Sequence, residues 1–315
     1  MATAVPAARR PGELDLSTDD DQVDAGGHLD PGYMAARRVL LDALTALQPH
    51  GKAIIVVGAQ AIYLHTGGND IAIAPYTTDG DLALDPSLLG ADPELETAMR
   101  GAGFALLLHG DRRAQPGTWT ATVDVGGGRL VVPVDLIVPE AAATGGGRRG
   151  ARLGTHGNRA ARRSVGLEAA LVDHKLMTVT ALDPADPRAV DVEVAGMPAM
   201  IVAKAHKIHD RVRSGRADRM SDKDASDIYR IMQTVSPGEA GAVLRGLRRH
   251  AMAGAATDAA VRYMDDLFGR RGAVGVKMAQ RALRLAVPEQ QVAAVCLSFT
   301  ERLLAAARQG QGKDE

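Results

Sequence analysis

The chain has 315 residues, of which 46% are hydrophobic and 24% charged, and its formal net charge is −1. This length and composition are typical of a globular protein that buries a core of its own, and the balanced charge excludes a protein that is basic overall. The single cysteine excludes an internal disulfide, and no apolar run reaches the length of a membrane span.

The N-terminal residues are rich in Ala, Pro, Gly and Asp, which predicts a disordered tail over 1–30. Acidic residues, not an apolar segment, follow Arg9 and Arg10, so no secretory signal is expected. Together with the lone Cys296, this pattern predicts a cytoplasmic protein without a membrane partner.

The next part of the chain alternates helix and strand patterns. Apolar residues at helical spacing between Met34 and Leu47 predict a helix that ends before Gly51. The apolar run at 53–57 predicts a buried strand, and a helix at 59–65 follows it. The further elements expected here are strands at 77–85, 104–110, 118–125 and 129–138 and a helix at 93–103.

The second half of the chain changes from strands to helices. A Gly- and Arg-rich stretch at 139–165 predicts a long loop, and two strands are expected at 176–182 and 189–196. Helices are expected at 198–214, 221–234, 237–250, 257–269 and 288–308. Capping-box spacing supports two of their starts, at Ser221 with Asp224 and at Ser236 with Glu239. The order predicts an α/β (α+β) fold with a mixed sheet flanked by helices over 31–197, followed by a helical region over 198–315.

Asp79 and Asp81 are separated by one glycine in the strand expected at 77–85. Side chains two residues apart in a strand share a face, so the two carboxylates would project together. Adjacent carboxylates repel unless a cation or a proton lies between them, and Mg²⁺ prefers oxygen ligands. The pair therefore indicates a site for Mg²⁺ or Mn²⁺; the alternative is a pair of solvated acids at a turn.

Gly58, Ala59 and Gln60 lie at the junction between a predicted strand and a predicted helix. Backbone N–H groups at such a junction can bind a phosphate, because glycine permits close approach and the helix N-terminus adds partial positive charge. The alternative is an ordinary tight turn.

Asp135 is a lone acid in the apolar string VVPVDLIVP. Since a buried carboxylate without a partner is unfavourable, Asp135 is expected to complete the metal cluster, to act as a base, or to face water at a sheet edge. Asp124 competes for this role, but the glycine turn beside it favours exposure.

The string VVGAQAIYLHTGG…TTDGDLALD resembles the signature of the nucleotidyltransferase superfamily, an apolar strand, a glycine turn and a helix before Asp-x-Asp. Within it, the closest resemblance is to AbiEii/AbiGii-type toxin nucleotidyltransferases, which carry a second motif, Ala-x-Lys-x-x-Ala…Arg…Arg-Asp-x-x-Asp. VAKAHKIHDRVRSGRADRMSDKDASDIYRI is similar to that motif, with matching residues at Lys204, Arg211, Asp224 and Asp227. The resemblance covers about residues 50–235. Ala59 departs from it, because the family has Gly or Ser there.

The resemblance implies a metal-dependent nucleotidyltransferase that moves an NMP from an NTP such as ATP to an acceptor hydroxyl. The implied acceptors are tRNA, a protein or a small molecule, and a toxin of this kind would have a cognate antitoxin. The residues expected to take part in catalysis are Asp79, Asp81, Asp135, Lys204 and Asp224, the first three as metal ligands. The residues expected to bind the nucleotide are Gly58, Ala59, Gln60, Lys207, Arg211 and Asp227.

Spacing within the expected helices supports a cationic face near this site. Lys204, Lys207 and Arg211 are spaced i, i+3, i+7 and can neutralise a triphosphate, while Asp224 and Asp227 can hold Lys204 in position. Two alternatives stay open, a non-catalytic protein that senses nucleotide or docks a partner, and phosphoryl transfer or nucleotide hydrolysis at a similar site.

A run of arginines without acids lies in the stretch expected to be a loop. It comprises Arg148, Arg149, Arg152, Arg159, Arg162 and Arg163. Such charge can attract RNA or a polyphosphate, and the alternative is a flexible solvated loop.

Overall fold

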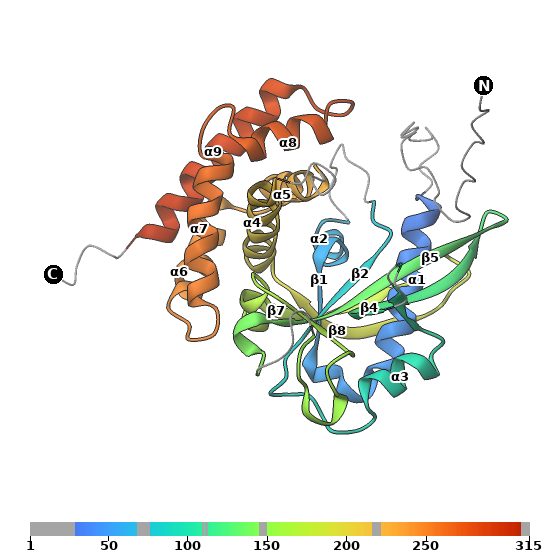
Figure 1. Ribbon diagram of the computed structural model, residues 1–315. Helices are drawn as coiled ribbons and strands as arrows, with labels where there is room; N and C mark the ends of the chain where they lie inside the picture. Colours follow the sequence, from blue (N-terminus) through green and yellow to red (C-terminus); the bar gives the residue numbers. More distant parts are fainter. Residues whose placement is uncertain are drawn as a thin grey trace, which may run out of the picture.

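The computed structural model describes residues 29–67, 76–108, 110, 113–144, 150–215 and 222–309. The tail predicted at 1–30 lies outside them except for its last two residues. Figure 1 shows a sheet with helices against it in one part of the molecule and the helices α6 to α9 gathered beside it. Within the described residues, eight strands form one mixed sheet in the order β3-β4-β5-β2-β1-β8-β7, with β6 beside β5. The predicted fold class, a mixed α/β sheet followed by a helical C-terminal region, is therefore confirmed.

The strands are β1 (Ile54–Val57), β2 (Gly80–Leu84), β3 (Ala105–Leu108), β4 (Ala114–Val125), β5 (Gly128–Pro139), β6 (Arg162–Ser164), β7 (His174–Thr180) and β8 (Ala189–Ala195). The α-helices are α1 (Pro31–Ala46), α2 (Gly58–Thr66), α3 (Leu95–Gly101), α4 (Met197–Ser214), α5 (Lys223–Thr234), α6 (Pro237–Arg248), α7 (Gly254–Phe268), α8 (Val274–Ala282) and α9 (Glu289–Arg308). None of the helices in the described ranges combines the length and apolarity that a bilayer crossing needs.

The centre of the sheet joins segments that are far apart in the sequence. β1 pairs antiparallel with β2 and parallel with β8, and β2 pairs parallel with β5. Parallel pairs need a crossover connection, and helices and further strands lie between β1, β2, β5 and β8 along the chain. The site depends on these long-range pairings.

Helix α1 covers one face of the sheet, where it packs against β2, β4, β5 and β8. Gly80 lies directly under this helix, because a Cβ placed there would meet Leu40 Cδ1 at 3.3 Å. Since strand side chains alternate between faces, Asp79 and Asp81 project toward the opposite face.

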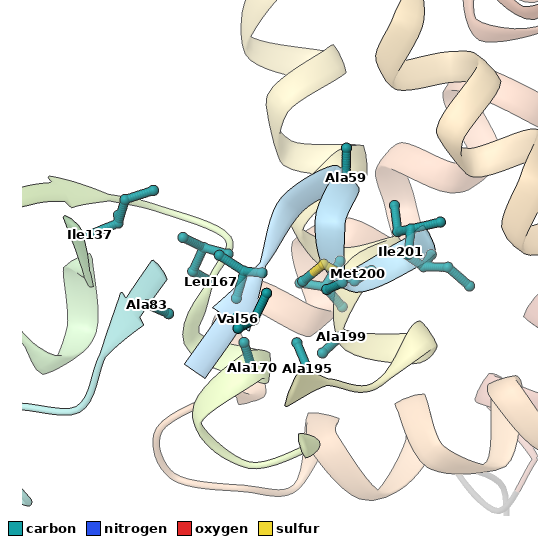
Figure 2. Packing of buried hydrophobic residues seen from close by; sticks show 14 of the residues in the cluster. Val56, Ala59, Ala83, Ile137, Leu167, Ala170, Ala195, Ala199, Met200 and Ile201 are labelled. Atoms are coloured by element: carbon teal, nitrogen blue, oxygen red, sulfur yellow. The ribbon is translucent and has the colours of Figure 1, made fainter. Parts of the chain in front are cut away.

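The other face packs on the segment before β7 and on helix α4. Figure 2 shows Leu167 and Ala170 beside Val56 of β1, and Met200 of α4 in the same apolar cluster. Val56, Ala170 and Met200 are fully buried, and burying a side chain of the size of Val or Met contributes about 1.5–3 kcal/mol. This packing holds α4 against the central strands.

Among the strands and α-helices of the described residues, β6 and α8 were not predicted from the sequence. β6 lies in the stretch expected to be a loop, so the prediction of a long loop over 139–165 is wrong at Arg162–Ser164. Helix α8 was missed because Gly275 lies in its first turn. Gly275 is needed for packing, since a Cβ there would lie 2.8 Å from Phe268 Cζ.

Several local predictions are confirmed. The Ser236 side chain accepts the Glu239 N–H at 3.4 Å and caps α6, as its spacing indicated. The other predicted start is wrong: α5 begins at Lys223 with Asp222 as its N-cap, and Ser221, the predicted cap, lies outside the described residues. Cys296 is buried, and that burial raises the pKa of its thiol to about 12.

Candidate active site

Asp81 and Asp135 lie opposite each other on adjacent parallel strands, and Val57 lies opposite Asp81 on the other side. Residues in register on neighbouring strands point to the same face, so the two carboxylates share the face away from α1. Asp79 precedes β2 by one residue and projects to that face too. Asp79 and Asp81 from one predicted string and Asp135 from another are therefore brought to the same face of the sheet.

The turn at Gly58 packs directly against Asp81. Gly58 has φ +72°, and a Cβ there would lie 3.0 Å from both Cβ and Cγ of Asp81 and overlap its carboxylate. Glycine is therefore required both for the backbone conformation and for the close approach. It places the N-terminus of α2 beside the Asp81 carboxylate, where the sequence predicted a phosphate-binding turn.

The side chains of the next two residues face the protein interior. Ala59 and Gln60 are buried, and Gln60 accepts a hydrogen bond from Arg37 Nε at 3.0 Å and donates to the Asp79 carbonyl at 3.5 Å. Only the backbone of this turn is thus available to a ligand, while the Gln60 side chain ties α2 to the strand that carries Asp79.

The Asp81 carboxylate lies in a region of unbalanced negative charge. Burial raises its pKa to about 6, with Asp79 as the next largest cause, while Lys207 and Arg162 act in the opposite direction. Among the described residues, neither Asp79 nor Asp81 forms an ion pair. A cation bound between them would relieve this repulsion.

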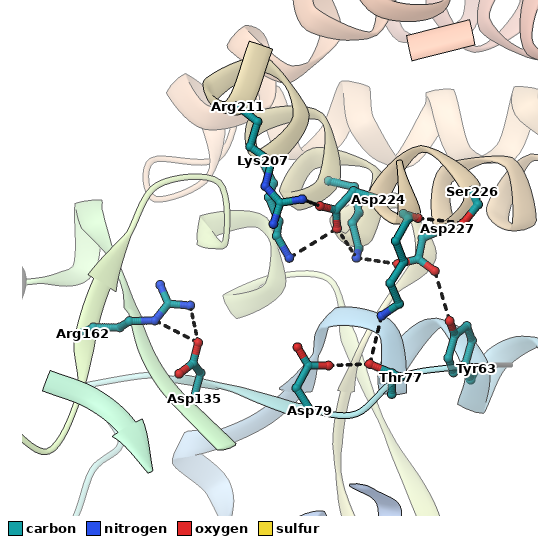
Figure 3. A network of polar contacts seen from close by, with 12 residues as sticks. Tyr63, Thr77, Asp79, Asp135, Arg162, Lys207, Arg211, Asp224, Ser226 and Asp227 are labelled. Carbon is teal, nitrogen blue, oxygen red and sulfur yellow. Dashed lines mark hydrogen bonds and ion pairs between the residues drawn. The ribbon is translucent and has the colours of Figure 1, made fainter. Parts of the chain in front are cut away.

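Asp135 is held by an arginine that was not among the predicted site residues. Its Oδ2 accepts hydrogen bonds from Arg162 Nη2 at 2.7 Å and Nε at 3.1 Å (Figure 3). Its Oδ1 is buried and has no hydrogen-bond partner in the described part of the chain. Leaving a buried acceptor unsatisfied costs about 1–3 kcal/mol, so Oδ1 is a candidate ligand atom.

The three carboxylates do not form a closed metal site in this structure. Within the described ranges, no group of three or more His, Cys, Asp or Glu side chains is arranged to hold a metal ion. The expected convergence is thus present in the backbone register of Asp81 and Asp135, while the Asp135 carboxylate is turned to Arg162.

Helices α4 and α5 carry a second polar cluster. Lys204 Nζ donates to Asp224 Oδ1 at 2.7 Å and to Asp227 Oδ2 at 2.6 Å, and all three side chains are buried. This confirms the expectation that the two aspartates hold Lys204 in position. Burial alone would lower the pKa of Lys204, but Asp224 and Asp227 raise it above its ordinary value. Lys204 is therefore a charged residue enclosed by its partners.

The outer part of this cluster is more exposed. Asp224 also pairs with Lys207, at 3.3 Å, and with Arg211 (Figure 3). Although burial opposes it, Lys204 and these two cations hold the pKa of Asp224 below its usual range. The Lys207 side chain is 47% exposed and lowers the pKa of Asp81, so it belongs electrostatically to both clusters.

Thr77 connects the two clusters and was missed in the sequence. This buried residue donates from Oγ1 to Asp79 Oδ1 and accepts from Lys223 Nζ at 2.9 Å. The available signal was its place two residues before Asp79 in the strand expected at 77–85, although β2 itself begins only at Gly80. Arg162 gave no such signal, because its contact with Asp135 spans 27 residues.

The remaining arginines of the stretch at 139–165 are partly neutralised. Arg159 pairs with Glu96 at 3.1 Å and Arg163 with Glu140 at 3.1 Å. Arg148 and Arg149 lie outside the described residues. RNA or polyphosphate attraction by this stretch stays a prediction.

Comparison with known proteins does not identify the chain. No protein-family model matches it, and no curated protein matches it either.

The site must therefore be interpreted from its chemistry. Asp79, Asp81 and Asp135 offer only carboxylate oxygens, which are the donors that Mg²⁺ and Mn²⁺ prefer. The buried, unpartnered Asp135 Oδ1 and the repulsion around Asp81 both fit such a cation. The Gly58 turn packs against Asp81, and Lys207 acts electrostatically on the same carboxylate.

Proposed function

We propose that the protein is a metal-dependent nucleotidyltransferase that moves an NMP from an NTP to an acceptor hydroxyl. The observation that carries this proposal is the alignment of Asp81 with Asp135 on adjacent strands, with the Gly58 turn packed against Asp81. It joins an oxygen-ligand set for a divalent cation to a backbone turn suited to phosphate.

In the proposed reaction the acceptor oxygen attacks the α-phosphorus of the NTP and forms a new P–O bond. The bond from the α-phosphorus to the bridging oxygen of the β-phosphate breaks, pyrophosphate leaves with that oxygen, and the hydroxyl proton passes to solvent. When bound by Asp79, Asp81 and Asp135, Mg²⁺ or Mn²⁺ supplies neutralisation of phosphate charge.

The chain's own groups supply positioning and further positive charge. Backbone N–H groups at Gly58 bind phosphate, and Lys207 and Arg211 face the developing charge from α4. Lys204, with Asp224 and Asp227, fixes α4 against α5, and Thr77 orients Asp79. Lys204 acts here as a positioning residue.

The resemblance to AbiEii/AbiGii-type toxins supports tRNA or a protein as the acceptor, a cognate antitoxin as partner, and a cytoplasmic location. A small-molecule acceptor is the alternative within the same reaction class.

A second candidate is a nucleotide-binding protein without turnover that senses nucleotide or docks a partner. Two observations favour it: Ala59 lacks the hydroxyl of the family's serine, and Arg162 neutralises Asp135.

The test is incubation of the protein with each α-³²P-NTP, Mg²⁺ and total cell RNA or protein. The matched variants are D79N/D81N and the control D124N, an exposed acid at the far end of β4. We expect labelled acceptor and pyrophosphate from the natural chain and from D124N, and neither from D79N/D81N.

Saturable nucleotide binding without labelling would support the second candidate, and release of inorganic phosphate would indicate phosphoryl transfer or hydrolysis. Equal labelling by D79N/D81N would contradict the assignment of the two aspartates.

A further inference from the structure

Arg162 and Asp135 form the one ion pair in the described part of the chain that involves an acid of the candidate metal site. Both side chains are partly exposed, at 28% and 22%. Both Arg162 donors bind the same oxygen, Oδ2, while Oδ1 is left buried without a hydrogen bond. The carboxylate is therefore only half satisfied by its arginine.

The backbone fixes Arg162 at this place. β6 pairs in parallel with β5, with Arg162 opposite Ile137, two residues beyond Asp135. Gly117 has φ +76°, donates its N–H to the Arg159 carbonyl at 2.9 Å, and would overlap the Arg162 backbone if it carried a Cβ. Because β6 pairs with β5 and lies against Gly117 of β4, the backbone of Arg162 is fixed and the exchange is left to its side chain.

Asp135 pairs with Arg162, although Asp81 is the acid that lies opposite it on the adjacent strand. Asp81 and Asp135 are direct neighbours on adjacent strands, yet the described residues contain no three-carboxylate group ready to hold a metal. Figure 3 shows Asp135 joined to Arg162 and Asp79 joined separately to Thr77. Since neighbouring strands lie about 4.8 Å apart, the Asp135 side chain is within reach of Asp81.

We propose that Arg162 is a counter-ion that releases Asp135 when a divalent cation binds and then contacts the triphosphate of the incoming nucleotide. This inference rests on the proposed function and adds a nucleotide-binding residue and an order of events to it. A guanidinium binds phosphate with the same paired N–H geometry that it uses for a carboxylate, so the exchange leaves neither charge alone. A triphosphate also carries more negative charge than one divalent cation neutralises, so a further cation is needed beside it.

The exchange predicts two effects of opposite sign in R162Q. Without nucleotide, Mn²⁺ affinity should rise at least fivefold, because the guanidinium no longer competes for Asp135. With Mn²⁺ present, affinity for a non-hydrolysable NTP analogue should fall at least fivefold, because a phosphate contact is lost. The control is R159Q, which removes a nearby arginine that pairs with Glu96 and should change neither affinity.

Mn²⁺ binding is measured by electron paramagnetic resonance and analogue binding by calorimetry, so neither readout needs turnover. In a D135N background, adding R162Q should no longer change Mn²⁺ affinity, since the competed carboxylate is gone. R162K, which keeps the charge with one donor group, should lie between the natural chain and R162Q and replaces it if R162Q does not fold.

Unchanged or weaker Mn²⁺ binding in R162Q would overturn the proposal, and unchanged analogue binding would refute the transfer of Arg162 to the triphosphate. If the natural chain labels an acceptor and R162Q does not tighten Mn²⁺ binding, only this inference fails. If R162Q tightens Mn²⁺ binding and the natural chain never labels an acceptor, the proposed function fails instead.

Discussion

The acids of α5 and the two acids at the start of β2 differ in what neutralises them. Asp224 and Asp227 bind Lys204, and Asp224 also binds Lys207 and Arg211, so their charge is balanced within the chain. Asp79 and Asp81 have no ion pair among the described residues, and burial and mutual repulsion raise the pKa of Asp81 to about 6. The α4–α5 cluster is therefore complete as folded, whereas Asp79 and Asp81 lack a cation that a ligand can bring.

The largest effect on stability is expected in the complete cluster. K204A leaves the buried Asp224 and Asp227 without their central cation, which should destabilise the fold by about 3–5 kcal/mol. Urea unfolding measures this loss. The control K175A, at an exposed position of β7, should stay within about 0.5 kcal/mol of the natural chain. A similarly small effect of K204A would show that the cluster is not self-contained.

Removing the charge of Asp81 should change stability in the opposite direction. In metal-free protein at pH 7.5, D81N should stabilise the fold, by at most about 3 kcal/mol, since it removes an unbalanced charge. The raised pKa means that folded Asp81 binds a proton more tightly than the unfolded chain does. Proton binding to Asp81 thus stabilises the natural chain at pH 4, and this stabilisation is lost as the pH rises through about 6.

Urea unfolding at several pH values measures the difference in stability between D81N and the natural chain. The advantage of D81N should vanish near pH 4 and reach its full size above pH 7. Excess Mn²⁺ should then stabilise the natural chain and not D81N. A D81N variant that is less stable at pH 7.5 without metal would contradict the unbalanced charge.

A smaller effect is expected at the residue that connects the clusters. T77V keeps the shape of the side chain but removes hydrogen bonds to Asp79 and Lys223, which should cost about 2 kcal/mol of stability. Mn²⁺ affinity should also fall several-fold, because Asp79 is no longer oriented. T122V, at an exposed position of β4, is the control, and unaltered Mn²⁺ binding in T77V would remove Thr77 from the site.

The smallest effect is expected at the exposed edge of the α4–α5 cluster. K207A should leave stability within about 0.5 kcal/mol, because Asp224 keeps Lys204 and Arg211. Affinity for an NTP analogue should fall about fivefold, or about 1 kcal/mol, with K52A as a distant control. Loss of stability without loss of affinity would assign Lys207 to the scaffold alone.

The elements of the fold were largely predictable because their signals are local. Alternation and apolar runs located β1, β2, β5 and β8, and Pro237 with Ser236 marked the start of α6. β6 was not predictable in this way, since three residues become a strand only when Gly117 lets them approach β5. Helix α8 forms despite Gly275, because Val276 and Met278 are buried against neighbouring helices.

The site was predictable where one strand or one helix face carries it. Asp79 with Asp81, and Asp224 with Asp227, follow from periods of two and three residues. The pairing of these two aspartates with Lys204 was expected from the family resemblance. These periods do not show which lysine faces the candidate metal site. In the structure Lys204 is enclosed by its partners, and Lys207 is the lysine that lowers the pKa of Asp81. The side-chain role of Gln60 and the pairing of Arg162 with Asp135 depend on contacts that no local pattern encodes.

Binding of Mn²⁺ in the presence of an NTP analogue tests the central claim most directly. Electron paramagnetic resonance should show one site per chain in the natural protein and in D124N, with affinity at least tenfold weaker in D81N. Equal Mn²⁺ affinity in D81N and the natural chain would contradict a divalent cation bound by Asp79, Asp81 and Asp135.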